Sequence, residues 1–357
     1  MGYAWPMSEA PVAIATPPSH RGLPFEHAIF VLSPFGLLPT TLLLFIAMFG
    51  SFVAIASAEG VTIVRHDGFT FSDAGWPALV LSLLCCTALA MQRYARTAEA
   101  REAPNYARIL SGGTTSALAI TTAVSSEARL GRATLMGVAF GAMLSVAIRV
   151  AEYHEGHTIP PGAMAWFALA TTLLAVLFAR GAEQTRAGGR AYAGVLHSEL
   201  TIDLLRTDTL SVLGRSAARH SLIWFVISGV ACLFFVRGDL NWLTILLIAG
   251  CATMGITMFA ASMGRIHHQI VQAKMAELEN IRCRIDALRN KLHEDAFASA
   301  SLHGLLAYEK RVQEAQEWPF DQTTLARVAA STLILTVPWF GQAIAAYVVD
   351  HLGRFAG

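Results

Sequence analysis

The chain has 357 residues, of which 54% are hydrophobic and only 14% are charged, and its net charge is +1. Soluble domains carry about 25% charged residues, so this composition excludes an ordinary soluble globular protein. With a net charge of only +1, no nucleic-acid partner is expected. The five cysteines are predicted to lie in membrane helices or in a cytosolic helix, which does not indicate a disulfide framework.

The N-terminal segment, residues 1–26, contains five prolines. It lacks the compact order of basic, apolar and cleavage-site residues that a signal peptide shows. We therefore interpret residues 1–26 as a flexible cytosolic tail, followed in 27–262 by a six-span membrane bundle.

Seven apolar stretches follow the tail, and their interiors carry no charged residue. A helix needs about 20 apolar residues to cross the hydrocarbon core of a bilayer. The fold class is therefore predicted to be all-α, a polytopic transmembrane helical bundle with about seven spans. These stretches are Gly36–Ser57, Ala74–Met91, Thr134–Val150, Ala163–Ala179, Ser221–Val236, Trp242–Ser262 and Val328–Val349. Without a lysine or carboxylate inside a span, the sequence indicates neither a retinal Schiff base nor a proton- or sodium-coupled carrier.

The positive charges are unevenly distributed among the connecting segments. Of the 26 Lys and Arg, 22 lie in the N-terminal tail or in the segments 92–133, 180–220 and 263–327. Cytoplasmic loops carry an excess of these residues. This predicts a multi-pass protein of the bacterial inner (plasma) membrane with the N-terminus inside and the C-terminus outside, and with basic cytosolic loops at 92–133 and 180–220.

One further stretch, Ile109–Ser126, carries no charge but is rich in Gly, Ser, Thr and Ala. We interpret it as an interfacial or re-entrant segment, with an eighth membrane helix as the alternative. In the third span, Gly137 and Gly141 form a GxxxG motif, which predicts close helix packing against a partner in the same chain or in another.

A loop predicted on the outer side contains two His and two Glu within six residues. These types of side chain can bind Zn²⁺ or Cu²⁺, so a divalent metal is the one cofactor considered, and no catalytic residue is expected. The candidate ligands are Glu152, His154, Glu155 and His157, with His66 as a further His. A pH sensor and an ordinary solvated loop are the alternatives.

The largest segment outside the membrane, residues 263–321, is predicted to be a cytosolic helical hairpin or coiled coil. Its outgoing helix, Gly264–Leu292, carries an a/d seam that is typical of coiled coils, and its return helix is Ser301–Gln316 after a turn at Ala296–Ala300. The seam residues proposed for oligomerisation are Val271, Leu278, Ile281, Ile285, Leu288 and Leu292. The seam is longer than the return helix can cover. Either self-association of the hairpin covers the remainder, or the hairpin stays alone and the other basic loops cover it. Residues 322–357 then hold the last span and a short outer tail.

The sequence Glu317-Trp318-Pro319-Phe320-Asp321 precedes the last apolar stretch. Together with Ile202-Asp203-Leu204-Leu205, Arg219, Gly264 and Lys274, it makes the C-terminal half similar to an uncharacterised family of bacterial polytopic inner-membrane proteins. The resemblance implies no known activity.

These observations favour an integral membrane protein that is a non-enzymatic sensor or scaffold. It would couple the membrane bundle to a cytosolic coiled coil, with the lipid bilayer and either a homo-oligomer or a membrane complex as partners. An oligomeric ion channel or a passive transporter is the alternative, because channels need no charge inside the membrane.

Overall fold

The computed structural model describes residues 25–64, 71–122, 126–154, 160–199, 211–237, 242–289, 296–315 and 317–318. These residues form α1 (Phe25–Leu32), α2 (Leu37–Ala58), α3 (Gly75–Ile109), α4 (Gly113–Thr121), α5 (Glu127–His154), α6 (Pro161–Glu199), α7 (Ser211–Ala231), the 3₁₀ helix η2 (Cys232–Arg237), α8 (Trp242–Arg289) and α9 (Ala296–Glu314). The all-α prediction is confirmed. Six of these helices (α2, α3, α5, α6, α7 and α8) are long and apolar enough to cross a membrane. The expected seventh span, 328–349, lies outside the described residues.

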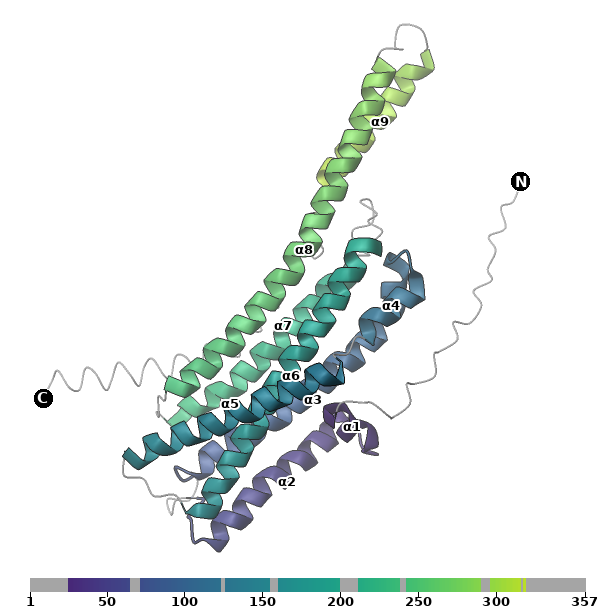
Figure 1. Ribbon diagram of the computed structural model, residues 1–357. Coiled ribbons are helices and arrows are strands. Elements are labelled where there is room, and N and C mark those ends of the chain that lie inside the picture. Colours follow the sequence, from purple (N-terminus) through teal and green to yellow (C-terminus); the bar gives the residue numbers. More distant parts are fainter. Residues whose placement is uncertain are drawn as a thin grey trace, which may run out of the picture.

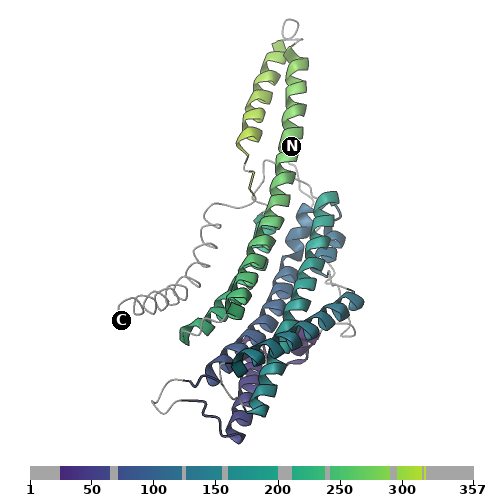
Figure 2. The same cartoon turned by 60° about the vertical axis from the view of Figure 1, so that its left-hand side comes forward.

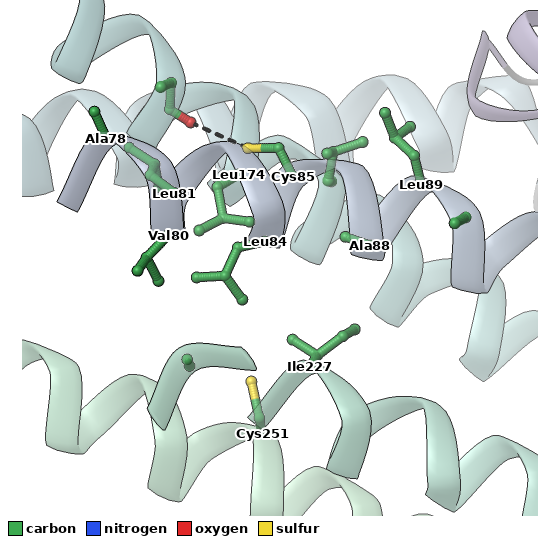
Figure 3. Packing of buried hydrophobic residues seen from close by; sticks show 14 of the residues in the cluster. Ala78, Val80, Leu81, Leu84, Cys85, Ala88, Leu89, Leu174, Ile227 and Cys251 are labelled. Atoms are coloured by element: carbon green, nitrogen blue, oxygen red, sulfur yellow. Dashed lines mark hydrogen bonds between the residues drawn. The ribbon is translucent and has the colours of Figure 1, made fainter. Parts of the chain in front are cut away.

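Helix α3 is the central helix of the bundle. The buried share of its apolar window is 61%, against 11% for the windows of α2 and α5 and 17% for that of α8. Figure 3 shows Leu84 of α3 on the side that faces Ile227 of α7 and Cys251 of α8, whereas the Cys85 thiol lies 3.8 Å from the Ala170 carbonyl oxygen of α6. The poorly buried windows of α2, α5 and α8 leave these helices at the periphery, where apolar side chains suit lipid.

The GxxxG motif finds its partner within the same chain. A Cβ atom on Gly137 would lie 2.6 Å from the Cα of Val176, and one on Gly141 would lie 2.6 Å from the Cα of Thr172. Both neighbours are backbone atoms of α6. The two glycines therefore allow α5 and α6 to approach more closely than helices with any larger residue at these positions could.

The Glu59 carboxylate, just after α2, caps the N-terminus of α6. Helix α2 ends in a Schellman turn, in which Gly60 has a φ of +72° and the Val61 N–H donates to the Ala56 carbonyl at 2.8 Å. The turn places Glu59 at the first residues of α6, where its two carboxylate oxygens accept from the N–H groups of Gly162 (2.6 Å) and Ala163 (2.8 Å). The negative charge also interacts favourably with the helix dipole of α6.

Substitutions at this cap should destabilise the protein through one shared contact. We expect Glu59→Ala to lower the free energy of unfolding by about 1 kcal/mol, the usual cost of losing a cap. A Cβ on Gly162 would lie 2.6 Å from Glu59 Oε1, so Gly162→Ala should displace the carboxylate at a similar cost. Titration with a denaturing detergent would measure both losses.

The matched control for this pair is Gly188→Ala, since Gly188 also lies in α6 but has no atom within 4 Å of a built Cβ. The double variant should lose less than the sum of the two single losses, because both changes remove the same contact. Equal stabilities of Gly162→Ala and Gly188→Ala would contradict this account of the cap.

Several helices are longer than a bilayer requires. At about 1.5 Å per residue, the 35, 39 and 48 residues of α3, α6 and α8 rise about 52, 58 and 72 Å, against a hydrocarbon core of about 30 Å. The surplus extends at one end of the bundle, from which α8 and α9 project (Figure 1). Most arginines of α3, α6 and α8 lie in this extension, and we call it the basic end. Large parts of the predicted basic loops 92–133 and 180–220 are therefore helical.

A second apolar cluster holds the basic end together, separate from the main core. Its buried residues are Tyr106, Ile109, Leu110, Ala117, Ile120, Tyr192, Val212, Leu213, Ala217, Met263, Ile266 and Ile270. They come from α3, α4, α6, α7 and α8. This cluster therefore packs α8 against the other long helices after it leaves its apolar segment.

Helix α4 decides between the two interpretations of Ile109–Ser126. It has nine residues, which rise only about 14 Å and cannot cross a bilayer. Ala117 and Ile120 of α4 are buried in the second cluster. The eighth membrane helix is therefore excluded, and the stretch covers one side of the basic end instead.

Helices α8 and α9 form the expected antiparallel hairpin, which projects well beyond the other helices in both views (Figures 1 and 2). Ile281 of α8 and Val312 of α9 are 1% and 0% exposed. Arg282 donates to Glu309 at 3.1 Å, and the Tyr308 hydroxyl donates to Glu277 at 3.1 Å. The predicted turn at Ala296–Ala300 is wrong, because α9 begins at Ala296. Three of these five residues are alanine, which has the highest helix propensity.

Two residues of the motif before the last apolar stretch close the base of the hairpin. The Lys274 ammonium group lies 3.1 Å from the Glu317 carboxylate, and Trp318 stacks on His267 with ring centroids 4.3 Å apart. Lys274 lies three residues after the seam residue Val271, and its ammonium group holds the end of the return segment. The remaining three residues of the motif lie outside the described residues.

Candidate functional site

The predicted metal ligands are not part of the described site. His66, Glu155 and His157 lie outside the described residues, and Glu152 and His154 end α5 at positions whose side chains are not described. Within the described ranges, no group of three or more His, Cys, Asp or Glu is arranged to hold a metal ion. The metal site at this loop stays a prediction.

The predicted seam residues lie on the hairpin. Ile281 is buried, and Val271, Leu278, Ile285 and Leu288 are half-buried; Leu292 lies outside the described residues. On α8, residue 281 and its seam neighbours lie along the face that α9 covers, while Ile266 and Ile270 enter the second cluster. Within one chain, Ile281 is therefore fully covered and the other four described seam residues are only partly covered. The role of the seam in oligomerisation stays a prediction.

A cavity of about 80 Å³ lies between α3, α6 and α7, where the bundle meets the basic end. We call it the junction cavity. Its polar lining residues are Gln92, Arg96, Glu99, Gln184, Thr185 and His220. Its larger apolar lining residues are Leu177, Phe178, Ile223, Trp224 and Ile227.

Helical spacing explains why these side chains converge. Residues 92, 96 and 99 of α3 are separated by four and three positions, so they lie on one face of that helix. On each of the three helices, the polar lining residues lie toward the basic end and the apolar ones toward the middle of the span. Phe178 and Trp224 stack at the apolar side with centroids 6.0 Å apart. The junction cavity is therefore polar at one end and apolar at the other.

Two buried amide groups leave hydrogen-bonding capacity at the cavity. Gln92 Nε2 donates to the Leu177 carbonyl at 3.2 Å, but Gln92 Oε1 and Gln184 Nε2 have no hydrogen-bond partner among the described residues. Buried polar groups are nearly always paired. The cavity volume exceeds the roughly 10–15 Å³ that one water needs. The geometry therefore suits water or a small polar ligand that can both donate and accept.

His220 and Glu99 form a proton-sharing pair at the cavity. His220 Nε2 lies 3.0 Å from Glu99 Oε1, and Nδ1 lies 2.9 Å from the Ser216 carbonyl oxygen. A carbonyl oxygen can only accept, so Nδ1 carries a proton. A second proton then lies between Nε2 and the carboxylate, on one or the other of these groups. The proton can move between His220 and Glu99 without the loss of either contact, whereas its removal from the pair would leave the Nε2 lone pair facing the carboxylate.

Further charges extend this pair across the bundle. Arg219 of α7 lies 2.7 Å from Glu102, one turn beyond Glu99 on α3. Arg96 interacts electrostatically with both Glu99 and Glu26. The network therefore links α1, α3 and α7 at the level of the junction cavity.

Glu26 and Arg180 form a buried ion pair at the other edge of this network. Arg180 donates through Nε and Nη2 to the two carboxylate oxygens of Glu26, the latter at 3.1 Å, and through Nη1 to Thr134 Oγ1 at 2.9 Å. Its guanidinium carbon lies 4.8 Å from the centroid of the Phe25 ring. The Glu26 side chain is fully buried. Residues 25 and 26, assigned to the flexible tail from sequence, thus begin α1 and attach it to α6.

The polar residues of the junction cavity were not predicted from the sequence, although one signal was present. The spacing of Gln92, Arg96 and Glu99 indicates a helical face that continues out of the second apolar stretch. The ion pair between Glu26 and Arg180 gave no such signal, because the two residues are 154 positions apart.

The six apolar helices make the chain a multi-pass integral membrane protein that requires a lipid bilayer around it. Comparison of the chain with protein-family models, with curated proteins and with solved structures finds no match in any of the three.

Proposed function

We propose that the protein is a non-enzymatic membrane sensor or scaffold, in which the state of the junction cavity is coupled to the position of the α8–α9 hairpin. One observation carries the proposal: α8 runs without a break from Trp242 in its apolar segment to Arg289 in the hairpin. A continuous helix transmits a tilt along its length, because its backbone hydrogen bonds resist bending. Placement in a bacterial inner membrane, with the hairpin in the cytosol, rests on the distribution of positive charge.

The contacts of α7 supply the connection between cavity and hairpin. His220 and Trp224 of α7 line the cavity. On the same helix, Ser221 Oγ donates to the Gly255 carbonyl of α8 at 2.9 Å, and Leu213 and Ala217 pack in the second cluster with α8. A rearrangement of the pair between His220 and Glu99 would therefore act on α8 through α7.

The coupling can be tested with the exposed Cys283 of the hairpin, since the other four cysteines are buried. A spin label on Cys283 and a second on Thr122→Cys, an exposed position after α4, would report the distance between hairpin and bundle. From Gly264 to Cys283 the helix rises about 28 Å. A tilt of about 5° at Gly264 would thus move Cys283 by about 2.5 Å.

We expect Glu99→Ala and His220→Ala to shift this distance by about 2 Å or more in lipid nanodiscs, because each leaves its partner unpaired in the junction cavity. The matched control is Glu127→Ala, which removes an exposed carboxylate at the start of α5 and should leave the distance unchanged. If the distance distributions of these three variants were identical to that of the chain without these changes, the coupling would be overturned.

A second candidate function is a passive transporter, because the junction cavity has room and polar groups for a small polar solute. The apolar side of the cavity, with the stacked Phe178 and Trp224, interrupts the polar lining toward the middle of the span, and this supports the sensor instead. A solute flux into proteoliposomes that Gln184→Leu abolishes would favour the transporter.

A further inference from the structure

A groove lined by arginines lies between α5 and α6, on the side of the bundle away from the junction cavity. It has a volume of about 650 Å³, within the range of about 300–1,000 Å³ that is typical of ligand sites. Arg129 and Arg132 lie one turn apart on α5, and Arg186 and Arg190 lie one turn apart on α6. Its other lining residues are Ala133, Met136, Ala179, Ala182 and Glu183. We call it the arginine groove.

The charge of the arginine groove is strongly positive. Its four arginines face one carboxylate, that of Glu183, which lies 3.9 Å from Arg190. All four arginines are exposed, in contrast to the nearby Arg180, whose guanidinium is held by Glu26. Guanidinium groups bind phosphate oxygens through paired N–H donors. The groove therefore suits a phosphate-bearing anion.

The surroundings of the groove indicate where this anion comes from. Leu135 and Met136 of α5, beside and within the groove, are 70% and 71% exposed. The apolar window of α5 is one of the least buried in the bundle. The arginines lie at the basic end of that window, where apolar surface meets the charged extension. A ligand with a phosphate head and hydrocarbon chains matches both parts, and basic pockets between membrane helices bind anionic lipid head groups.

From this geometry we infer that the arginine groove binds the head group of an anionic glycerophospholipid, with the acyl chains lying along the exposed face of α5. The inference is independent of the proposed sensor function. It places one ordered lipid at the junction of α5 and α6, next to the glycines that pack these helices together.

The test uses the full chain in a neutral detergent, titrated with phosphatidylglycerol or with phosphatidylcholine and followed by native mass spectrometry. Each arginine near a membrane surface contributes about fivefold to the binding of an anionic lipid. We therefore expect the variant with Arg129→Gln, Arg132→Gln, Arg186→Gln and Arg190→Gln to bind phosphatidylglycerol several hundredfold more weakly. The double variant Arg186→Gln with Arg190→Gln should lose about 25-fold in binding, which keeps the test available if the fourfold variant does not fold.

The matched control removes four exposed arginines outside the groove: Arg101→Gln, Arg265→Gln, Arg284→Gln and Arg289→Gln. It should bind phosphatidylglycerol as the unchanged chain does. Equal binding of the two lipids, or equal losses in the groove and control variants, would overturn the inference. Competition by millimolar inorganic phosphate or glycerol 1-phosphate would also overturn it, because it would assign the groove to a soluble phosphate.

Discussion

Replacement of Arg180 by methionine is expected to lower the free energy of unfolding by about 3–5 kcal/mol, the usual cost of breaking a buried ion pair. The change leaves the fully buried Glu26 carboxylate without its two guanidinium donors, and it also removes the donor to Thr134. The loss can be measured by titration with a denaturing detergent. Arg180→Lys should lose part of this stability, because an ammonium group cannot reproduce the paired contact.

The double variant Arg180→Met with Glu26→Gln separates the ion pair from the packing of α1. It should recover much of the loss, because no charge is then left buried without a partner. A control is Lys310→Met, since the Lys310 side chain is 77% exposed and its ion pair with Glu314 spans 3.9 Å; surface pairs of this kind contribute about 0–1 kcal/mol. Equal effects of Arg180→Met and Lys310→Met on the free energy of unfolding would show that α1 does not depend on its attachment to α6.

The variants Gly137→Ala and Gly141→Ala are each expected to lower the free energy of unfolding by about 1–3 kcal/mol, the typical cost of overpacking. In each case the new methyl group would lie 2.6 Å from a Cα atom of α6. A backbone atom of α6 cannot move away from the new methyl group by a change of rotamer, as a long side chain can, so α5 and α6 must separate. The effect of both changes together should be larger than that of either, and can be measured by the same titration.

The control for the glycine variants is Gly131→Ala, one turn and a half earlier on α5, where a built Cβ has no atom within 4 Å. Alanine is favoured over glycine by up to about 1 kcal/mol inside a helix, so this change should leave the protein equally stable or more stable. If Gly137→Ala had the same effect as Gly131→Ala, the close approach of α5 to α6 would be disproved.

The membrane helices could be predicted from sequence because each is a long apolar run, and length and hydropathy are local properties. The GxxxG motif likewise predicted a close approach at Gly137 and Gly141. The motif could not reveal α6 as the partner, because small residues allow close approach to any neighbouring helix.

The basic end was harder to predict for a physical reason. Residues 92–109 of α3 carry many charges and Pro104, so they show no continuous apolar stripe. Their helix is stabilised by a few buried contacts, such as those of Tyr106 and Ile109 in the second cluster. These contacts join five helices, and pairings of that kind depend on tertiary structure that local periodicity does not encode.

The length of α8 determines the electrostatic potential that a protein docking near the end of this helix would experience. The part of α8 from Met263 to Arg289 rises about 40 Å, several times the Debye length of about 8 Å at physiological ionic strength. The surface potential of an anionic leaflet has therefore decayed before the tip is reached. A protein that docks on the described end of α8 would not be repelled by the lipid surface, even if that protein were acidic.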